Sequence, residues 1–461
     1  RIDVNEKDRR MNLHAMLGKR AEDNNPIRVG LIGAGKFGTM YLSQAARTRG
    51  VQIMAIADLD PERARQACAR VGGLDPSAST FEDAYRNGNT HVTDDSMALV
   101  AADGIEVVID ATGSPGAGIA HALSCCEHGK HIVMVNVEAD VLAGPLLAER
   151  ARQAGVVYSL AYGDQPALIH EQVDWARACG LDVIAAGKGT KYLDGYHYVT
   201  PDDVWEHYGL TPAQAEAGGM NPQMFNSFLD GTKSAIEMAA VANATGLSPA
   251  SDGLAFPACG THDLPHIMRP RDEGGVLHHK GQVEVISSEE RDGRHVAGDL
   301  RWGVYVVFEA PTDYVRACFD EYGLLTDSSG SYSTLWKPFH LIGLELGISV
   351  ASVALRHEST GAPTGFRGDA VATAKRDLKP GEELDGEGGF TVYGKLMPGE
   401  ASLAAGGLPI GLAHHVKLKN AVTKDQPVRW SDVEIDETSQ AVQVRREMEA
   451  MFAGPSVQAA Q

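Results

Sequence analysis

The feature that most constrains the fold is a glycine-rich turn between an apolar run and an amphipathic one. Residues 27–32 read I-R-V-G-L-I, as expected of a strand buried on both faces. Gly33, Gly35 and Gly38 follow in the segment G-A-G-K-F-G, where an amphipathic helical pattern begins. Asp58 ends the next apolar run, about 20 positions after the last glycine. A strand, this turn, a helix and a distant carboxylate are together typical of a unit that binds a dinucleotide.

Each position of the turn predicts one contact. Gly33 permits the tight turn, Gly35 lets the backbone approach a pyrophosphate, and Gly38 lets the helix pack on the strand. The first residues of the helix, Lys36 and Phe37, place backbone N–H groups at its positive end, where the pyrophosphate would lie.

Asp58 bears on the choice of cofactor. A carboxylate at the end of that strand can accept hydrogen bonds from the ribose diol of NAD and would repel the extra phosphate of NADP. Arg63 and Arg65 lie close enough to serve that phosphate if Asp58 turns away, although a solvated helix face is the commoner place for such arginines. On the residues alone, Asp58 favours NAD.

Alternating strands and helices continue to residue 163. Further apolar runs that read as buried strands lie at 51–57, 105–111, 131–135 and 156–160. The alternation predicts a parallel, doubly wound Rossmann domain over 27–163. Four residues follow the ends of two of these strands, where the ligand crevice of such a sheet lies, and we expect them at the cofactor. They are Thr112, Gly113, Asn136 and Glu138.

The pattern changes after this domain. Residues 164–365 predict an α+β middle domain for catalysis and dimerisation, with a helix at 230–245 and strands within 276–308 that we expect to pair antiparallel. We also expect a helix at 336–346. Short strands with Gly/Pro turns predict a small all-β domain over 366–440. The fold class is therefore α/β, and the remaining segments are an N-terminal extension, 1–26, and a tail, 441–461.

Charge and hydropathy exclude two kinds of partner. A formal net charge of −20 would repel a nucleic acid backbone. No apolar run reaches the roughly 18 residues of a membrane span. The six cysteines form no CxxC pair and no Cys/His cluster with zinc spacing, which fits a reducing compartment. We expect a cytoplasmic protein that acts on a small, anionic substrate.

Lysines supply the candidate chemistry. Hydride transfer to a carbonyl needs a proton donor or a cation near the developing alkoxide. Lys188 and Lys191 lie in G-K-G-T-K-Y, and Asp230 and Lys233 lie in D-G-T-K at the start of the predicted helix. A carboxylate and an ammonium three positions apart face the same side of a helix. We take all four as candidate catalytic residues; the alternatives are a solvated loop for the first pair, and a helix cap with a surface lysine for the second.

The segment D-S-S-G-S-Y-S-T-L-W-K, at 327–337, offers hydroxyl and ammonium donors before the helix expected at 336–346. Donors at a helix N-terminus suit a phosphate or a carboxylate. A plain serine-rich loop is the commoner alternative. The candidate phosphate ligands are Ser328, Ser329, Ser331 and Lys337.

From residue 28 to about 245 the chain resembles the homoserine dehydrogenase family, through G-A-G-K-F-G, D-A-T-G, G-K-G-T-K-Y and D-G-T-K. That family uses a lysine with an acidic partner near the substrate hydroxyl. The resemblance therefore implies roles for Lys233 and Asp230, with Lys188 and Lys191 alongside.

Residues 370–435 resemble an SAF domain, a β-clip fold, through V-A-T-A-K-R-D-L-K-P-G-E-E-L. A Rossmann domain, a lysine-bearing middle domain and an SAF domain together resemble the bacterial DRL family, reductoisomerases of 1-deoxy-D-xylulose 5-phosphate. The resemblance implies formation of 2-C-methyl-D-erythritol 4-phosphate, an isoprenoid precursor of the MEP pathway. It further implies NADPH (or NADH), a divalent cation such as Mg or Mn whose ligands the sequence does not identify, and a homodimer.

Two other interpretations stay open. The first is a dehydrogenase of a small hydroxy acid or an amino-acid alcohol, such as homoserine. The second is a non-catalytic protein that senses nucleotides or binds carbohydrate through the SAF domain.

Overall fold

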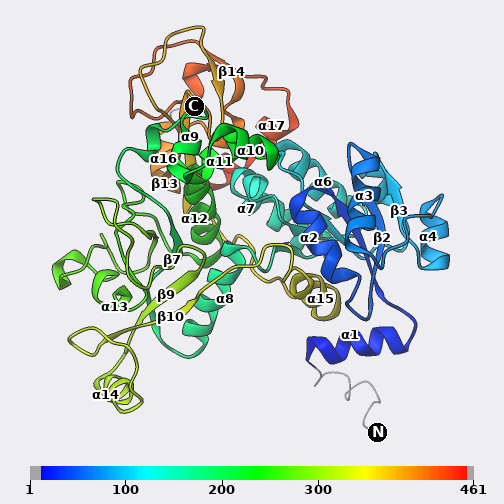
Figure 1. Cartoon of the computed structure of the whole chain (residues 1–461), viewed down its shortest axis with the longest axis horizontal. Coiled ribbons are helices and arrows are strands. Elements are labelled where there is room, and N and C mark those ends of the chain that lie inside the picture. Colours follow the sequence, from blue (N-terminus) through cyan, green and yellow to red (C-terminus); the bar gives the residue numbers. More distant parts are fainter. Residues whose placement is uncertain (1–11, 454–461) are drawn as a thin grey trace. The chain divides into compact units, whose positions relative to one another are not determined.

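The computed structural model describes residues 12–453, which form two compact units (Figure 1). The first unit runs to Ala167 and includes Leu341–Ala362. The second comprises Leu168–His340 and the chain from Pro363 onward. Within the described range, no helix combines the length and the apolar character that a membrane crossing requires.

A six-stranded parallel sheet forms the centre of the first unit, in the order β3-β2-β1-β4-β5-β6. Its strands are β1 (Ile27–Ile32), β2 (Val51–Ala57), β3 (His91–Thr93), β4 (Val107–Asp110), β5 (His131–Met134) and β6 (Tyr158–Leu160). The order reverses between β1 and β4, which makes the sheet doubly wound and places a ligand crevice at the carboxyl ends of these two strands. The predicted Rossmann fold is confirmed.

Helices complete the first unit. They are α1 (Leu13–Glu22), α2 (Lys36–Ala45), α3 (Pro61–Val71), α4 (Phe81–Asn87), α5 (Ser96–Ala101), α6 (Pro115–Glu127), α7 (Val137–Ala154) and α15 (Gly347–Arg356). Val350 and Val353 of α15 are fully buried in the same apolar cluster as Val29 and Leu31 of β1. A helix from late in the chain therefore completes the core of the N-terminal domain.

The second unit contains a mixed sheet in the order β10-β9-β7-β8. Its strands are β7 (Asp182–Thr190), β8 (Gln282–Ser287), β9 (Val304–Glu309) and β10 (Tyr332–Lys337). β7 pairs parallel with β8 and antiparallel with β9. The expectation that the strands within 276–308 pair with each other is wrong, because β7 lies between them. The helix expected at 336–346 is also wrong: its first residues finish β10.

Helix α12 (Thr232–Thr245) is the central helix of this unit. It contacts β7 and β8 of the mixed sheet and also β11 and β13 of the C-terminal domain. All of its residues are buried except Lys233, and most of them are small enough to pack closely on both sides. The other helices are α8 (Gln165–Ala178), which enters the unit from the first one, α9 (Val204–Tyr208), α10 (Pro212–Ala217), α11 (Pro222–Leu229), α13 (Leu264–Ile267) and α14 (Asp313–Glu321), with 3₁₀ turns η3 (Tyr196–Tyr198) and η4 (Arg271–Glu273).

Short antiparallel strands form the C-terminal domain, as expected. They are β11 (Gly368–Ala374), β12 (Glu383–Asp385), β13 (Val392–Pro398), β14 (His414–Leu418) and β15 (Val433–Glu434), accompanied by α16 (Gly399–Ala405), η5 (Ile410–Leu412) and η6 (Trp430–Asp432). Most of the segment expected as a tail is helix α17 (Gln440–Phe452). Arg445 of α17 is fully buried and forms an ion pair with Asp369 of β11, which fixes the helix to this domain.

Candidate functional site

The turn between β1 and α2 has the geometry that a bound pyrophosphate requires. Gly33 has φ of 97°, and a Cβ there would lie 2.7 Å from the carbonyl oxygen of Ala111. A Cβ on Gly38 would collide with the carbonyl oxygen of Gly33. A Cβ on Gly35, in contrast, would have no atom within 4 Å, and this residue caps α2 without a side-chain hydrogen bond. Open space beside an uncapped helix N-terminus fits a pyrophosphate, so Gly35 and the N–H groups of the next two residues would hold it.

Asp58 lies at the end of β2 and is almost completely buried. Its carboxylate accepts hydrogen bonds from Ala34 N at 2.7 Å, from Asp60 N at 2.9 Å, and from Arg63 Nη2 and Nε at 2.6 and 3.2 Å. Burial alone would raise the pKa of Asp58, but the hydrogen bonds from Arg63, Asp60 and Ala34 together lower it below its ordinary value. Arg63 therefore belongs to the cofactor end of the sheet, where the sequence alone favoured a solvated helix face.

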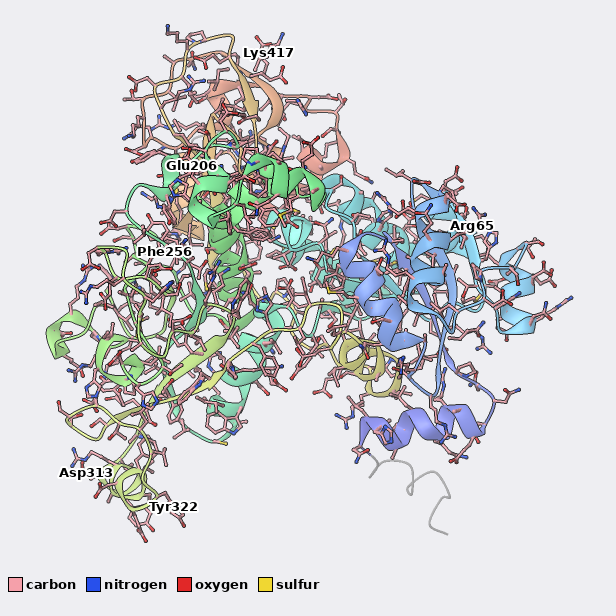
Figure 2. All side chains as sticks on the ribbon, in the orientation of Figure 1. Arg65, Glu206, Phe256, Asp313, Tyr322 and Lys417 are labelled. Atoms are coloured by element: carbon pink, nitrogen blue, oxygen red, sulfur yellow. The ribbon has the colours of Figure 1, made fainter. Side chains whose placement is uncertain are left out.

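Arg65 behaves differently from Arg63. It lies on the exposed side of α3 (Figure 2), and its closest carboxylate is that of Glu62 at 3.9 Å. A pair this exposed and this long contributes little stability. Arg65 thus matches the solvated alternative and provides a control for Arg63.

A buried hydrogen-bond network supports the end of β4. Asp110 is fully buried and accepts from the backbone N–H and hydroxyl of Thr112 at 2.8 and 2.7 Å. His121 of α6 contacts its second oxygen through Nδ1 at 2.7 Å and reaches Ser96 through Nε2 at 2.8 Å. Asn136 donates to Thr112 Oγ1 at 3.1 Å. Two predicted residues, Thr112 and Asn136, are thus hydrogen-bonded to each other, and Asp110 with His121, whose roles sequence reasoning missed, hold the threonine in place.

Two further predicted residues flank this network. Gly113 follows Thr112, and a Cβ there would have no atom within 4 Å. Glu138 lies in the first turn of α7, which Asn136 caps by accepting from Ala139 N at 3.0 Å. Their contact with a cofactor stays a prediction.

The second candidate site is a charged cluster on one face of α12. Lys188 of β7 and Glu237 of α12 form an ion pair although the two residues are only 5% and 4% exposed. Lys233 lies one turn before Glu237, and residues at that spacing share a helix face. Lys233 therefore lies on the same helix face as the carboxylate that Lys188 contacts. The sequence signal for Glu237 was its position four residues after Lys233.

Asp230 and Lys191 lie outside this cluster. Asp230 is fully buried and forms an ion pair with Lys375 of the C-terminal domain, at 2.8 Å. Its other oxygen accepts from Thr232 N at 2.9 Å and so caps the start of α12. Lys191 donates to the carbonyl oxygen of His207 at 2.6 Å. The expected partnership of Asp230 with Lys233 is replaced by one with Lys375.

In the serine-rich turn at 327–331, N–H and hydroxyl groups donate hydrogen bonds to a carboxylate of the turn itself. Asp327 accepts from Ser329 N and Oγ, from Ser331 N and from Arg269. A carboxylate thus occupies the position that a phosphate would need, and the chain continues as strand β10. Lys337 ends that strand, roughly 17–20 Å from the turn at about 3.3 Å per residue. The predicted phosphate ligands Ser328, Ser329, Ser331 and Lys337 are therefore not gathered around one point.

Across residues 12–453, no group of three or more His, Cys, Asp or Glu side chains could hold a metal ion. The described side chains therefore do not by themselves fit the expected divalent cation.

Three segments of the chain match three family models. Residues 27–160 match "Oxidoreductase family, NAD-binding Rossmann fold", residues 163–346 match "Oxidoreductase DRL, catalytic domain", and residues 369–434 match the SAF domain. The chain is an NAD(P)-dependent oxidoreductase. None of the curated proteins matches the chain.

Solved structures give only distant similarities. Scyllo-inositol dehydrogenase from Lactobacillus casei shares 12% identity and a TM-score of 0.37 over 74% of this oxidoreductase and 92% of that chain. A probable dehydrogenase from Thermotoga maritima shares 14% identity and a TM-score of 0.37 over 72% and 90%. Biliverdin reductase from Synechocystis sp. PCC 6803 shares 17% identity and a TM-score of 0.26 over 37% of this chain and 48% of its own, so the oxidoreductase spans about half of that length. Similarities this weak carry no argument about the substrate.

Proposed function

We propose that this oxidoreductase is an NADPH-dependent reductoisomerase that converts 1-deoxy-D-xylulose 5-phosphate to 2-C-methyl-D-erythritol 4-phosphate. The buried Lys188–Glu237 pair beside Lys233 carries the proposal, because it places two ammonium groups and a carboxylate within the segment that matches the DRL catalytic domain. The Rossmann match before this segment and the SAF match after it give the domain order that the DRL resemblance implies, and so support the proposal.

The cluster can do the proton chemistry that such a reaction needs. Rearranging the carbon skeleton of a ketose requires a group that takes a proton from a hydroxyl and a cation that stabilises the carbonyl oxygen. Glu237 would accept the proton, and Lys188 would hold Glu237 in place within a low-dielectric interior, where the charges act strongly. Lys233 would meet the developing alkoxide, because it is the residue of α12 that escapes burial. Bound NADPH would supply the hydride.

Arg63 supports NADPH as the cofactor. The charge of Asp58 is already paired with the Arg63 guanidinium, so its repulsion of a 2′-phosphate is reduced. The Arg63 side chain is 55% exposed and can therefore also reach a phosphate outside the protein surface. No step is assigned to the expected Mg or Mn, since the described side chains do not form a metal site.

A dehydrogenase of homoserine or a similar hydroxy compound is the second candidate. Lys233 and Glu237 are a lysine and an acidic partner on one helix face, which is the pairing that the homoserine dehydrogenase resemblance implies. Asp230, the acidic residue of the D-G-T-K motif, forms its ion pair with Lys375 instead of Lys233. For this reason the dehydrogenase is the second candidate function.

The test supplies the purified chain with deoxyxylulose phosphate, NADPH and Mg or Mn, and follows absorbance at 340 nm. Parallel reactions contain homoserine with NAD or NADP. We expect NADPH consumption with the sugar phosphate, loss of that activity in Lys188→Met, and its retention in the matched variant Lys191→Met. Turnover of homoserine without turnover of the sugar phosphate would reverse the ranking. Equal activity in the two variants would refute the assigned cluster.

A further inference from the structure

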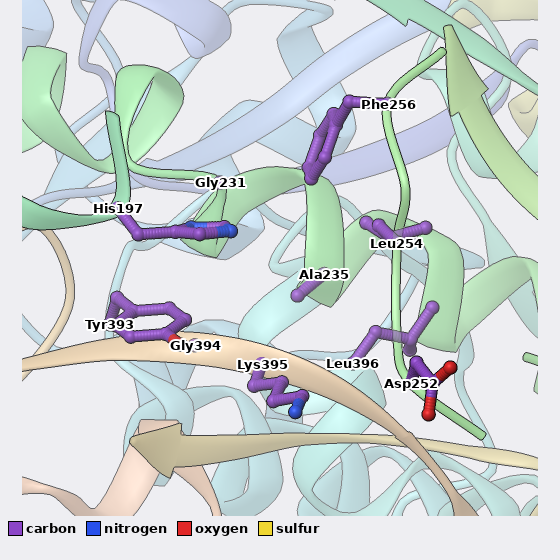
Figure 3. A pocket seen from close by; sticks show the side chains of 10 residues that line it. All are labelled: His197, Gly231, Ala235, Asp252, Leu254, Phe256, Tyr393, Gly394, Lys395 and Leu396. Carbon is purple, nitrogen blue, oxygen red and sulfur yellow. The ribbon is translucent and has the colours of Figure 1, made fainter. Parts of the chain in front are cut away.

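A cavity of about 140 Å³ lies beside the start of α12, and ten residues line it (Figure 3). Its walls are the start of α12, the loop at 252–256 and strand β13, all within the second unit. Gly231 and Ala235 face the cavity, while Lys233 and Glu237 carry the charged cluster. Both pairs are four residues apart, so each follows one face of the helix, and the two faces are different.

Aromatic rings form one wall of the cavity. His197 and Tyr393 are stacked, with ring centroids 4.5 Å apart and planes at 18° (Figure 3). His197 Nδ1 donates to the carbonyl oxygen of Asp230 at 2.6 Å, which leaves Nε2 as a hydrogen-bond acceptor. Burial lowers the pKa of His197 and keeps the ring neutral at neutral pH. The wall therefore offers a fixed acceptor rather than a positive charge.

The loop next to the His197 ring is held in a strained conformation. Phe256 has φ of 49°, a region that a bulky residue rarely adopts, yet it is 2% exposed and stacks on Tyr192 at 4.0 Å. The buried carboxylate of Glu284 accepts from the N–H groups of Ala255 and Phe256 and holds the loop. Strain of this kind persists only where the surrounding structure enforces it, and it gathers at ligand sites.

Opposite charges complete the cavity. Lys395 lies half-buried on β13, and Asp252 lies exposed on the facing loop (Figure 3). Leu254 and Leu396 add apolar surface next to them. An ammonium and a carboxylate beside apolar side chains complement a molecule that carries both a carboxylate and an ammonium on a short carbon skeleton.

We propose that this cavity binds a free α-amino acid, with its carboxylate at Lys395, its ammonium at Asp252 and its side chain toward the His197–Tyr393 wall. The cavity adjoins the first turn of α12, so an amino acid bound there contacts the helix that carries Lys233. The binding step involves neither the cofactor nor the substrate of the oxidoreductase, and it stands independently of the proposed reaction.

Isothermal titration of the full chain with each L-amino acid singly tests this proposal, without cofactor or substrate. Acetate and ethylamine, each carrying one of the two charges, are titrated alongside. We expect one or a few amino acids to bind and neither acetate nor ethylamine to do so at the same concentration. Equal binding of acetate or ethylamine would refute the recognition of both charges of one amino acid. If no amino acid binds, the proposed binding site is refuted.

Three variants locate the site. Lys395→Met and Asp252→Asn should each weaken binding by at least about tenfold, the effect of losing one hydrogen bond to a charged group. Lys417→Met removes an exposed lysine of the same domain (Figure 2) and should leave binding unchanged. Because Asp252 is exposed, its variant should fold even if Lys395→Met does not. Unaltered binding in Asp252→Asn, or an equal loss in Lys417→Met, would refute the assignment.

Discussion

Replacing Arg63 with alanine should switch the preference between the two nicotinamide cofactors. In the structure Arg63 binds both oxygens of Asp58, at 2.6 and 3.2 Å, and more than half of its side chain stays exposed. The Asp58 side chain itself is 1% exposed and keeps its hydrogen bonds from Ala34 and Asp60 without the arginine. Arg63→Ala therefore removes a cation from the ribose end of the site and leaves a carboxylate there.

The size of the effect follows from the contacts that are lost. A hydrogen bond to a charged group contributes about 1.5–3 kcal/mol, and about 1.4 kcal/mol corresponds to a tenfold change in Kd. We therefore expect NADPH to bind about 10- to 100-fold more weakly to Arg63→Ala. NADH should bind as well as before or better, because the Asp58 carboxylate becomes available to the ribose diol.

Fluorescence titration of each cofactor gives both dissociation constants without any substrate. Arg65→Ala is the matched control, since Arg65 lies on the same helix but contacts only Glu62, at 3.9 Å. The ratio of the NADPH to the NADH dissociation constant should rise in Arg63→Ala and stay constant in Arg65→Ala. A ratio that is unchanged in Arg63→Ala, or that changes equally in both variants, would refute this reasoning.

Three further predictions concern buried charges. Glu237→Gln removes the carboxylate that Lys188 contacts, and should lower turnover of the sugar phosphate by about 10²–10⁴-fold while the dissociation constant of NADPH stays the same. Arg445→Met leaves Asp369 buried without its ion-pair partner; urea unfolding should show a loss of about 3–5 kcal/mol, and adding Asp369→Asn should restore part of it. Burial raises the pKa of Asp140 from 3.8 to about 7, so between these values the folded chain holds a proton that the unfolded chain lacks, and stability falls as the pH rises. The Tm of Asp140→Asn should therefore rise relative to the Tm of the unaltered chain as the pH increases from about 5 to 8. A Tm difference that does not change with pH would contradict the raised pKa of Asp140.

Local patterns in the sequence were enough to predict the dinucleotide half of the molecule. Gly33 and Gly38 are required by contacts within a few residues or with the adjacent strand, as the collision of a Cβ on Gly38 with the Gly33 carbonyl oxygen shows. Buried parallel strands also leave a continuous apolar run that can be read directly. Asp110 and Thr112 illustrate the limit: both belong to the D-A-T-G motif, but the motif does not reveal that the buried aspartate orients the threonine.

The charged cluster on α12 could be predicted only in part because its partners are distant in sequence. Glu237 pairs with Lys188 from a strand far upstream, and a glutamate within a helix is ordinarily solvated. Asp230 has the spacing to serve Lys233, but Lys375 reaches it from another domain. The helix expected at 336–346 failed for local reasons: Trp336 and Lys337 continue strand β10, and Gly343 has φ of 73°, outside the helical range.

The link between Lys375 and Asp230 has a consequence for how the chain is made. During synthesis on the ribosome, Asp230 emerges long before Lys375. The Asp230 carboxylate at the start of α12 therefore cannot form its ion pair until the C-terminal domain has been synthesised. A nascent chain cannot bury that end of the helix at low cost until the SAF segment has left the exit tunnel. The C-terminal domain is therefore needed for the middle domain to fold. A chain that ends before Lys375 would leave the buried Asp230 carboxylate at the start of α12 without its ion-pair partner.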